Sequence, residues 1–321
     1  MSALWSASTI NKIDLDQRDS RPNPKQNANM NTFKYAMATL ALLLCCPLFA
    51  LETSPVLSDA EDWQLQKGLE TLIDEQNLTN AVSAQELAVV LVLVTDPDKP
   101  HLAELNGRNM VYAASLPKIA ILLGAAVEID DGRLELNSEL QTNIDNMIRY
   151  SCNACATEVL GQVGREELLD ILQSPRFNFY DQNGSGGLWV GKDYGPGAAY
   201  HRDPLSGLSH GANAFQAARF YYKLQNGSLV SPEQTQMMLQ ALSHPGIQHK
   251  FVKGLKAYPN LEIFRKSGSW KTYHSDSALV RGDGLAYIIV ALTNNPKGAF
   301  WLEKLASPLH ELAVSYNARI H

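Results

Sequence analysis

One apolar run constrains the fold of this chain more than any other stretch of its sequence. Residues 88–94 read Ala-Val-Val-Leu-Val-Leu-Val, which predicts a strand buried on both faces. A turn at Asp96-Pro97-Asp98 should reverse the chain, so residues 102–111 are expected to return beside that strand. Further strands are predicted only much later, at residues 263–269, 275–281 and 285–293. The early hairpin must therefore join the late strands in one sheet that a helical insertion interrupts.

Helical sequence accounts for both ends of the chain and for the insertion. Residues 58–76 carry apolar side chains at helical spacing, and residues 300–318 form a closing amphipathic helix. We therefore expect an α+β fold, in which an antiparallel five-stranded sheet is flanked by N- and C-terminal helices and carries an inserted all-helical subdomain. The sheet subdomain should comprise residues 51–114 and 256–321, and the helical subdomain residues 115–255. The glycine-rich stretch 174–211 is expected to be a long functional loop.

The first 50 residues read as material that precedes the folded domain. Residues 30–50 have a short cationic start, an apolar run and a small-residue exit, which is the pattern of a signal peptide. A membrane anchor is one alternative, but the run is shorter than the roughly 20 residues that span a bilayer. A lipid anchor on Cys45 or Cys46 is the other alternative. Residues 1–29 are interpreted as an upstream extension. We expect an exported, periplasmic protein with no membrane span in its mature chain.

Charge and cysteine content exclude several classes of function. The net charge is −6 with no long charge run, so nothing indicates a nucleic-acid partner. The mature chain would keep only Cys152 and Cys155, which read either as small buried residues, the reading we favour, or as a short disulfide. No cluster of ligand spacing lies near them, so we expect no metal and no cofactor. We also expect a monomer.

A serine and a lysine lie three residues apart where an apolar helix is expected to begin. In Ala114-Ser115-Leu116-Pro117-Lys118, one helical turn would bring the Ser115 hydroxyl and the Lys118 amine within reach of each other. A serine needs a nearby acceptor for its proton, and a lysine becomes one when burial lowers its pKa. The spacing alone also fits an ordinary helix start with a polar residue near its cap.

Two more polar triplets follow in an order that matches a known family. Ser151-x-Asn153 begins a predicted helix, and Lys266-Ser267-Gly268 opens a predicted strand. Taken singly, the first fits a helix cap and the second a solvated strand start. Together with the Ser115 motif, they make the chain resemble the class A serine β-lactamases and the penicillin-recognising peptidases that share their fold. The resemblance covers roughly residue 58 to the C-terminus.

The resemblance implies a role for each matched residue. Ser115 would be the acylated nucleophile and Lys118 its proton acceptor. Ser151 would pass a proton to the leaving nitrogen, and Lys266 would supply positive charge near the substrate carboxylate and Lys118. The substrate-binding residues would be Asn153, Ser267 and Gly268. The backbone N–H groups of Ser115 and Ser269 would form the oxyanion hole.

The chain departs from class A enzymes in two places. The loop motif Glu-x-x-Leu-Asn, whose glutamate activates the deacylating water, is absent from residues 174–211. Asp193 is the nearest substitute as a deacylation base, although the competing interpretation is a solvated carboxylate paired with Lys192. Cys152 stands where class A enzymes commonly carry aspartate. Without an activated water the acyl-enzyme would persist, so the resemblance implies acylation but not efficient turnover.

Three functions are consistent with these motifs. The first is β-lactamase-like hydrolysis of a β-lactam or a related small amide or ester. The second is a D-alanyl-D-alanine carboxypeptidase of the penicillin-binding type or a small-ester hydrolase, acting on a peptidoglycan-derived substrate. The third belongs to another class, a catalytically weak protein that binds a muropeptide or a partner.

Overall fold

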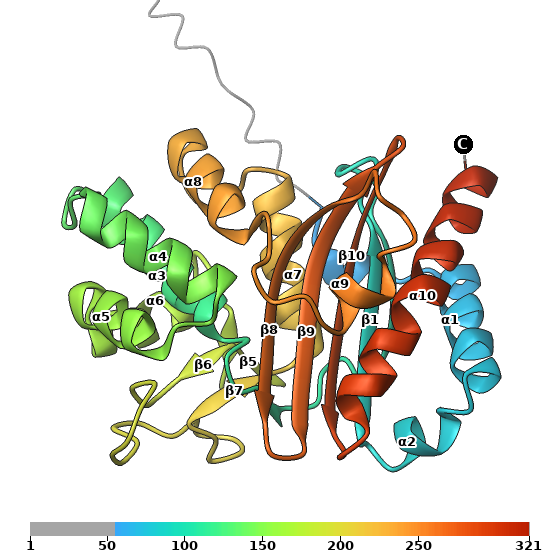
Figure 1. The fold of residues 1–321 in the computed structure, drawn as a ribbon, viewed down its shortest axis with the longest axis horizontal. Helices are drawn as coiled ribbons and strands as arrows, with labels where there is room; N and C mark the ends of the chain where they lie inside the picture. The colour runs from blue at the N-terminus through green and yellow to red at the C-terminus, as the bar shows by residue number, and fades with distance from the viewer. Residues whose placement is uncertain (1–54, 321) are drawn as a thin grey trace, which may run out of the picture. The chain divides into compact units, whose positions relative to one another are not determined.

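A five-stranded antiparallel sheet lies at the centre of the computed structural model, which describes residues 55–320. The predicted upstream extension and signal peptide, residues 1–50, lie outside the described residues. Both ends of the described chain contribute to the sheet, which confirms the predicted sheet with an insertion (Figure 1). The strand order is β2 (His101–Leu105), β1 (Leu87–Leu93), β10 (Leu285–Asn294), β9 (Tyr273–Gly282) and β8 (Glu262–Trp270).

Strand β1 is buried on both faces, as its sequence predicts. It pairs with β10 along its whole length and with β2 on its other side. Because side chains alternate between the faces of a strand, Val90 and Val92 enter the core shared with the helical insertion. Val89 and Leu91 enter a second core beneath the terminal helices. One short apolar run thus contributes to two hydrophobic cores.

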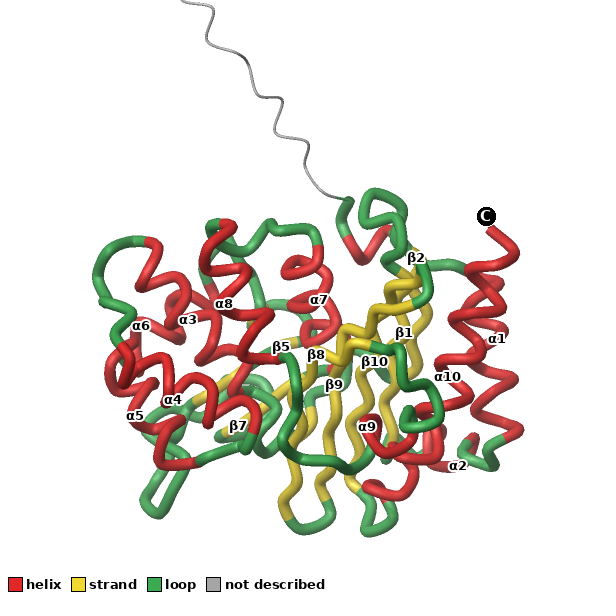
Figure 2. The backbone as a smooth tube through the Cα atoms, turned by 45° about the horizontal axis from the view of Figure 1, so that its top comes forward, coloured by secondary structure: helices red, strands yellow, loops and turns green. Residues whose placement is uncertain are grey.

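Helices cover both faces of the sheet, and Figure 2 shows the two sets on opposite sides of the strands. The terminal helices α1 and α10 pack against one face, and α7 packs against the other together with the insertion. No helix of the described residues is long and apolar enough to cross a membrane. The helices are η1 (Leu57–Asp59), α1 (Trp63–Glu75), α2 (Thr79–Ser83), α3 (Lys118–Asp130), α4 (Ser138–Arg149), α5 (Asn153–Val163), α6 (Arg165–Gln173), α7 (Ala214–Gln225), α8 (Pro232–Leu242), α9 (Phe251–Gly254) and α10 (Gly298–Ile320).

The strand expected over residues 102–111 is shorter than predicted. Strand β2 ends at Leu105, and Asn106 turns the chain in a left-handed conformation with φ of 52°. The amide of Asn106 donates to the carbonyls of Val82 and Leu87, at 2.7 and 2.9 Å, which fixes the turn. The chain then joins a different sheet, in which β3 (Val111–Tyr112) pairs with β7 (His210–Ala212).

The glycine-rich stretch contains more regular structure than a loop prediction allows. Strand β6 (Trp189–Val190) extends the β3–β7 pair to three strands. Strands β4 (Tyr180–Asp181) and β5 (Gly186–Gly187) form a separate pair. The boundaries predicted between the two subdomains stay a prediction, because all described residues belong to one compact unit. The small sheet nevertheless holds the residues before Ser115 against the long loop.

Candidate functional site

Ser115 lies in a tight turn between β3 and α3, so the helix begins later than its sequence indicates. Bonds of the i to i+3 type run from Lys118 N to Ser115 O, at 3.3 Å, and from Ile119 N to Leu116 O, at 3.1 Å. The preceding Ala114 has a φ of 52°, a conformation that costs a non-glycine residue roughly 1–2 kcal/mol. Such strain persists where the surrounding structure fixes it. The turn leaves the Ser115 side chain half-buried at a pocket.

Lys118 is the first residue of α3, and its side chain is fully buried. Its Nζ donates to Ser151 O at 2.7 Å, to Asn153 Oδ1 at 2.8 Å and to Cys152 O at 3.3 Å. Among the hydrogen bonds of residues 55–320, none joins Lys118 to Ser115, so the expected direct pair is not formed here. Burial lowers the pKa of Lys118 to about 7. The amine can therefore hold or release a proton near neutral pH.

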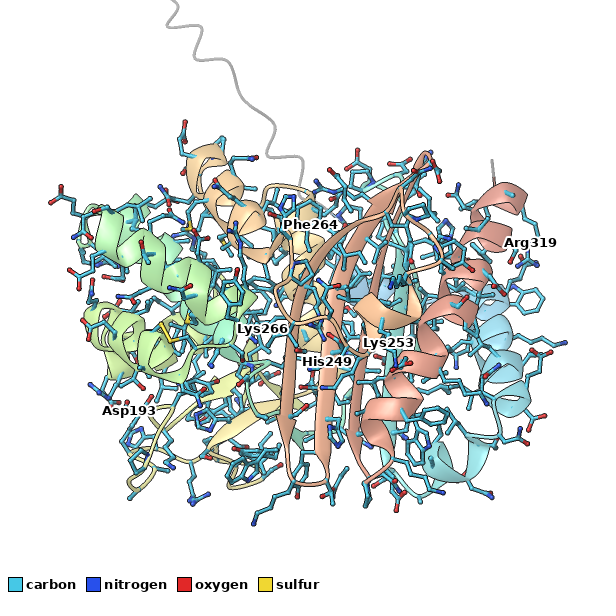
Figure 3. All side chains as sticks on the ribbon, in the orientation of Figure 1. Asp193, His249, Lys253, Phe264, Lys266 and Arg319 are labelled. Carbon is cyan, nitrogen blue, oxygen red and sulfur yellow. A yellow bond between two sulfur atoms is a disulfide. The ribbon has the colours of Figure 1, made fainter. Side chains whose placement is uncertain are left out.

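The hydroxyl of Ser151 lies between two buried lysines. Its Oγ is 3.0 Å from Lys266 Nζ and 3.5 Å from Lys118 Nζ. Lys266 reaches it from β8, pointing towards the helical insertion (Figure 3), and also donates to Ser267 O at 2.8 Å. Burial, and then the charge of Lys118, hold the pKa of Lys266 well below the ordinary lysine value. Two ammonium groups in one desolvated place repel each other, which favours a neutral amine on one of them.

A disulfide joins Cys152 to Cys155 at the start of α5, directly beside these contacts. Our preferred interpretation of small buried cysteines was wrong, and the alternative of a short disulfide is confirmed. Cys152 is the N-cap of α5, and its sulfur accepts from Cys155 N at 3.1 Å. Sulfur is a weak acceptor compared with the oxygen of an N-cap aspartate or serine. The covalent bond thus holds a turn whose hydrogen-bonded cap is weak.

The edge strand β8 passes directly against the Ser115 turn at Gly268. A Cβ on Gly268 would lie 2.3 Å from Ala113 O and 2.7 Å from Ser115 N, so no larger residue fits without a backbone shift. The hairpin between β8 and β9 closes on the pair Trp270 and Tyr273, and hydrogen-bonded pairs alternate along an antiparallel ladder. The closing pair is hydrogen-bonded, so the residue before it, Ser269, belongs to a pair that is not. The N–H of Ser269 therefore points away from β9. Ser115 and Ser269 both line the pocket that opens at this point.

A pocket of about 380 Å³ opens at this point, and it brings together Ser115, Asn153, Ser269 and Asp193 from four separate parts of the chain. Lys118, Ser151 and Lys266 do not line the pocket, but Lys118 contacts Asn153, which does. Ser267 does not line the pocket and is only 5% exposed. The remaining lining residues are Tyr112, Ala114, Lys192, Tyr194, Gly195, Pro196, His210 and Trp270.

Asp193 is paired with a different cation from the one its sequence neighbours suggest. Both of its oxygens accept from Arg165, each at 2.8 Å, so the expected pairing with Lys192 was wrong. The next residue, Tyr194, is buried, and its ring centroid lies 4.5 Å from Lys118 Nζ. Its hydroxyl donates to Ala114 O at 3.4 Å. An aromatic ring therefore covers Lys118 on the side of the long loop.

His210, which also lines the pocket, is neutral at neutral pH because burial lowers its pKa to about 4. Its Nε2 lies 2.9 Å from Lys192 O, so that nitrogen donates and fixes the tautomer. The described residues contain no group of histidine, cysteine and carboxylate side chains that could hold a metal ion.

A buried network behind β8 corresponds to none of the motifs in the sequence. Lys250, Arg265 and Asp276 are each no more than 3% exposed. Arg265 binds both oxygens of Asp276, at 2.7 and 2.8 Å. Lys250 donates to Gly268 O at 2.6 Å and to Ser269 Oγ at 2.8 Å. These charged residues have no recognisable spacing in the sequence, so no motif pointed to them. The one available indication was that Arg265 and Asp276 fall within predicted strands, where burial is expected.

Comparison with known proteins places these features in a family. A family model described as the beta-lactamase enzyme family matches residues 140–312, a span that includes Ser151, Asn153 and Lys266 but not Ser115. No curated protein matches the sequence.

Solved structures with the same fold include PBP-A, which is 17% identical, with a TM-score of 0.59 over 80% of this chain and 97% of PBP-A. A beta-lactamase from Sphaerobacter thermophilus is 15% identical, with a TM-score of 0.61 over 79% of this chain and 96% of its own. A class A beta-lactamase from Bacteroides cellulosilyticus is 14% identical, with a TM-score of 0.60 over 79% and 99%. At these identities the likeness shows the fold alone.

Proposed function

Because this chain belongs to the beta-lactamase enzyme family, and is a beta-lactamase-like serine hydrolase, we propose that it cleaves a β-lactam or a related small amide or ester through an acyl-enzyme on Ser115. The observation that carries the proposal is the Ser151 hydroxyl, held between two buried lysines beside the nucleophile turn. A hydroxyl in that position can relay protons between an amine base and a leaving nitrogen. The pocket beside it takes a ligand of small-molecule size.

Acylation requires an acceptor for the Ser115 proton, and Lys118 supplies it. As an ammonium, Lys118 directs its three N–H bonds to three oxygens, those of Ser151 O, Cys152 O and Asn153 Oδ1. Loss of one proton frees a lone pair that can turn to Ser115, three residues earlier. Oγ of Ser115 then bonds to the substrate carbonyl carbon as its proton passes to Lys118.

The carbonyl oxygen becomes an anion at the N–H groups of Ser115 and Ser269, which the close passage of Gly268 keeps together. Collapse of this intermediate breaks the carbon–nitrogen bond. The leaving nitrogen takes the proton of Ser151 Oγ, which a lysine ammonium restores. Removing one preorganised oxyanion donor typically costs about 2.7–4 kcal/mol in catalysis.

Mass spectrometry of the protein with penicillin G tests this proposal. We expect an adduct of one penicillin mass on the peptide that contains Ser115, and none in Ser115→Ala. The Ser138→Ala variant, which changes an exposed serine at the start of α4, should form the adduct normally. A Ser115→Ala variant that hydrolyses penicillin at the wild-type rate would show that Ser115 forms no covalent intermediate.

A second function, that of a D-alanyl-D-alanine carboxypeptidase of the penicillin-binding type, is favoured by the loop geometry. Both oxygens of Asp193 are bound to Arg165, and the Tyr194 ring covers Lys118. Among the described residues, Asp193 is the one carboxylate that lines the pocket, and Arg165 occupies it. An attacking water therefore lacks a carboxylate base, and the acyl-enzyme should persist. One of the solved structures of this fold is a leucine-to-glutamate variant of PBP-A in its acyl-enzyme complex with penicillin G.

The time course of the adduct separates these functions. Loss of the adduct within seconds favours the lactamase, and an adduct stable for hours, with release of D-alanine from a peptide that ends in D-alanyl-D-alanine, favours the carboxypeptidase. Absence of any adduct, together with saturable binding of a muropeptide, would favour a binding protein.

Export to the periplasm, directed by residues 30–50, completes the proposal. The disulfide supports it, because disulfides form and persist in oxidising compartments. Cell fractionation should find the full-length protein outside the cytoplasm and a chain that begins at residue 51 inside it. Sedimentation of the exported protein should give the mass of a monomer.

A further inference from the structure

Lys250 is a third buried lysine near the site, and the mechanism above does not use it. It precedes α9, and its side chain is only 1% exposed. Its Nζ donates to Gly268 O at 2.6 Å, to Ser269 Oγ at 2.8 Å and to Ser275 O at 3.0 Å. Since an ammonium has three N–H bonds, every donor of Lys250 is occupied. The group is therefore placed to act on the protein and not on a ligand directly.

The first of these contacts acts on the peptide unit that carries an oxyanion donor. The carbonyl of Gly268 and the N–H of Ser269 belong to the same peptide group. The carbonyl oxygen accepts a hydrogen bond from the Lys250 ammonium. The N–H points away from β9, towards the free edge of the sheet. A trans peptide holds these two groups on opposite sides, so both contacts can exist at once.

We infer that Lys250 is a positioning residue that strengthens the Ser269 N–H as an oxyanion donor by polarising the Gly268–Ser269 peptide. A positive charge on a carbonyl oxygen draws electron density through the amide and makes its N–H a stronger hydrogen-bond donor. The effect is larger in a buried place, where water does not screen it. This inference rests on the proposed acyl-enzyme, because only an anion at Ser269 N–H would benefit.

The surroundings show how a charge is kept at this place. Burial lowers the pKa of Lys250 to about 8, while the charge of Asp276 opposes the shift. Asp276 is itself fully buried, and it accepts from Arg265 and from Phe251 N at 3.1 Å. Asp276 thus fixes both the start of α9, next to Lys250, and strand β9. A buried ammonium is far more costly than a buried methionine of similar length, so packing alone does not explain this lysine.

Infrared difference spectroscopy of the penicillin acyl-enzyme measures the oxyanion donors directly. A stronger donor lowers the stretching frequency of the ester carbonyl. In Lys250→Met we expect this band to move to higher frequency, and the acylation rate constant to fall about tenfold with the binding constant unchanged. Lys250→Gln, which keeps a donor but removes the charge, should give an intermediate shift. Lys253→Met, three residues on and 59% exposed, is the matched control.

The outcomes distinguish the inference from the proposed function. A wild-type protein that forms no adduct removes the proposed function and this inference with it. An adduct in Lys250→Met with an unshifted carbonyl band overturns the inference alone, even if the melting temperature falls. If Lys250→Met does not fold, Lys250→Gln decides, because an unshifted band there also overturns it.

Discussion

Gly268 lies so close to Ser115 that a methyl group at its Cα would stand 2.7 Å from the Ser115 nitrogen. This contact joins the edge of the sheet to the turn that carries Ser115, the proposed nucleophile, and lies between the residues of the two proposed oxyanion donors. Because backbone atoms line the contact on the Ser115 side, no side-chain rotation can relieve a larger residue. The site therefore depends on a residue that has no side chain.

The Gly268→Ala variant should acylate at least 100-fold more slowly than the wild type, since the separated strand would remove one oxyanion donor. Stopped-flow measurement with a chromogenic cephalosporin checks this value. The control is Gly161→Ala in α5, where a Cβ meets nothing within 4 Å. It should stabilise the protein by up to about 1 kcal/mol. Normal acylation by Gly268→Ala would mean that the strand does not supply a donor.

The acylation rate should rise with pH through the pKa of Lys118, which is about 7. Neutral Lys118 is the reactive form, so below this pKa the rate constant should fall about tenfold for each pH unit. Above it the rate should reach a plateau. Single-turnover rates between about pH 5 and pH 9 test the profile, and circular dichroism at each pH controls for unfolding. A rate that is constant across the range would exclude Lys118 as the base.

Reduction of the disulfide should impair acylation more than it affects stability. Cys152 and Cys155 close a very small loop, so chain entropy contributes little to their effect. Their bond holds the turn that carries Ser151 and Asn153, both of which contact Lys118. We expect a several-fold loss of acylation rate and a loss of no more than about 0.5 kcal/mol in stability, because the sulfur cap of α5 is already weak.

The Cys152→Asp variant tests the cause of that loss. An aspartate can cap α5 with oxygen, so this variant should keep most of the acylation rate. Its acylation rate should not change when a reductant is added. Cys152→Ala, which has neither cap nor disulfide, should resemble the reduced protein. If both variants and the reduced protein acylate as fast as the oxidised wild type, the turn needs no restraint.

The Asp193→Asn variant should leave the lifetime of the acyl-enzyme within twofold of the wild type, because both oxygens of Asp193 already accept from Arg165. The pair is partly exposed, so the loss of stability should not exceed about 1 kcal/mol. Time-resolved mass spectrometry gives the lifetime. A large increase in lifetime would instead assign deacylation to Asp193. In that case the Arg165→Met variant, which frees the carboxylate, would shorten the lifetime of the acyl-enzyme.

Breaking the buried ion pair behind β8 should destabilise the protein strongly. Arg265 and Asp276 have side chains that are 2% and 0% exposed. Removing one partner, as in Asp276→Asn or Arg265→Met, should cost about 3–5 kcal/mol because the other charge stays buried. Replacing both with apolar residues should cost less than either single change. Urea unfolding measures all three, and additive losses would show that the two residues do not interact.

The sequence predicts the sheet well because each of its long strands is a local apolar run. β1 and β10 are almost wholly apolar, and their pairing follows from the need to bury them. The three site motifs are also recognisable locally, and the structure brings Ser151 and Lys266 into contact.

Features that depend on distant partners could not be predicted in this way. Asp193 is bound by Arg165, which lies 28 positions earlier, while its neighbour Lys192 was the obvious choice. Lys250 contacts β8 and β9 from a segment with no motif. The end of β2 at Leu105 is decided by the amide of Asn106 reaching two carbonyls on other segments.

The sheet takes β1 and β2 from the first part of the described chain and β8, β9 and β10 from the last. A nascent polypeptide leaves the ribosome amino end first, so Ser115 emerges long before the strand that must lie beside it. Until β8 arrives, the nucleophile has neither Gly268 as a neighbour nor Lys266 nearby. A product truncated before β8 would therefore lack both the proposed donor of Ser269 and the charge of Lys266.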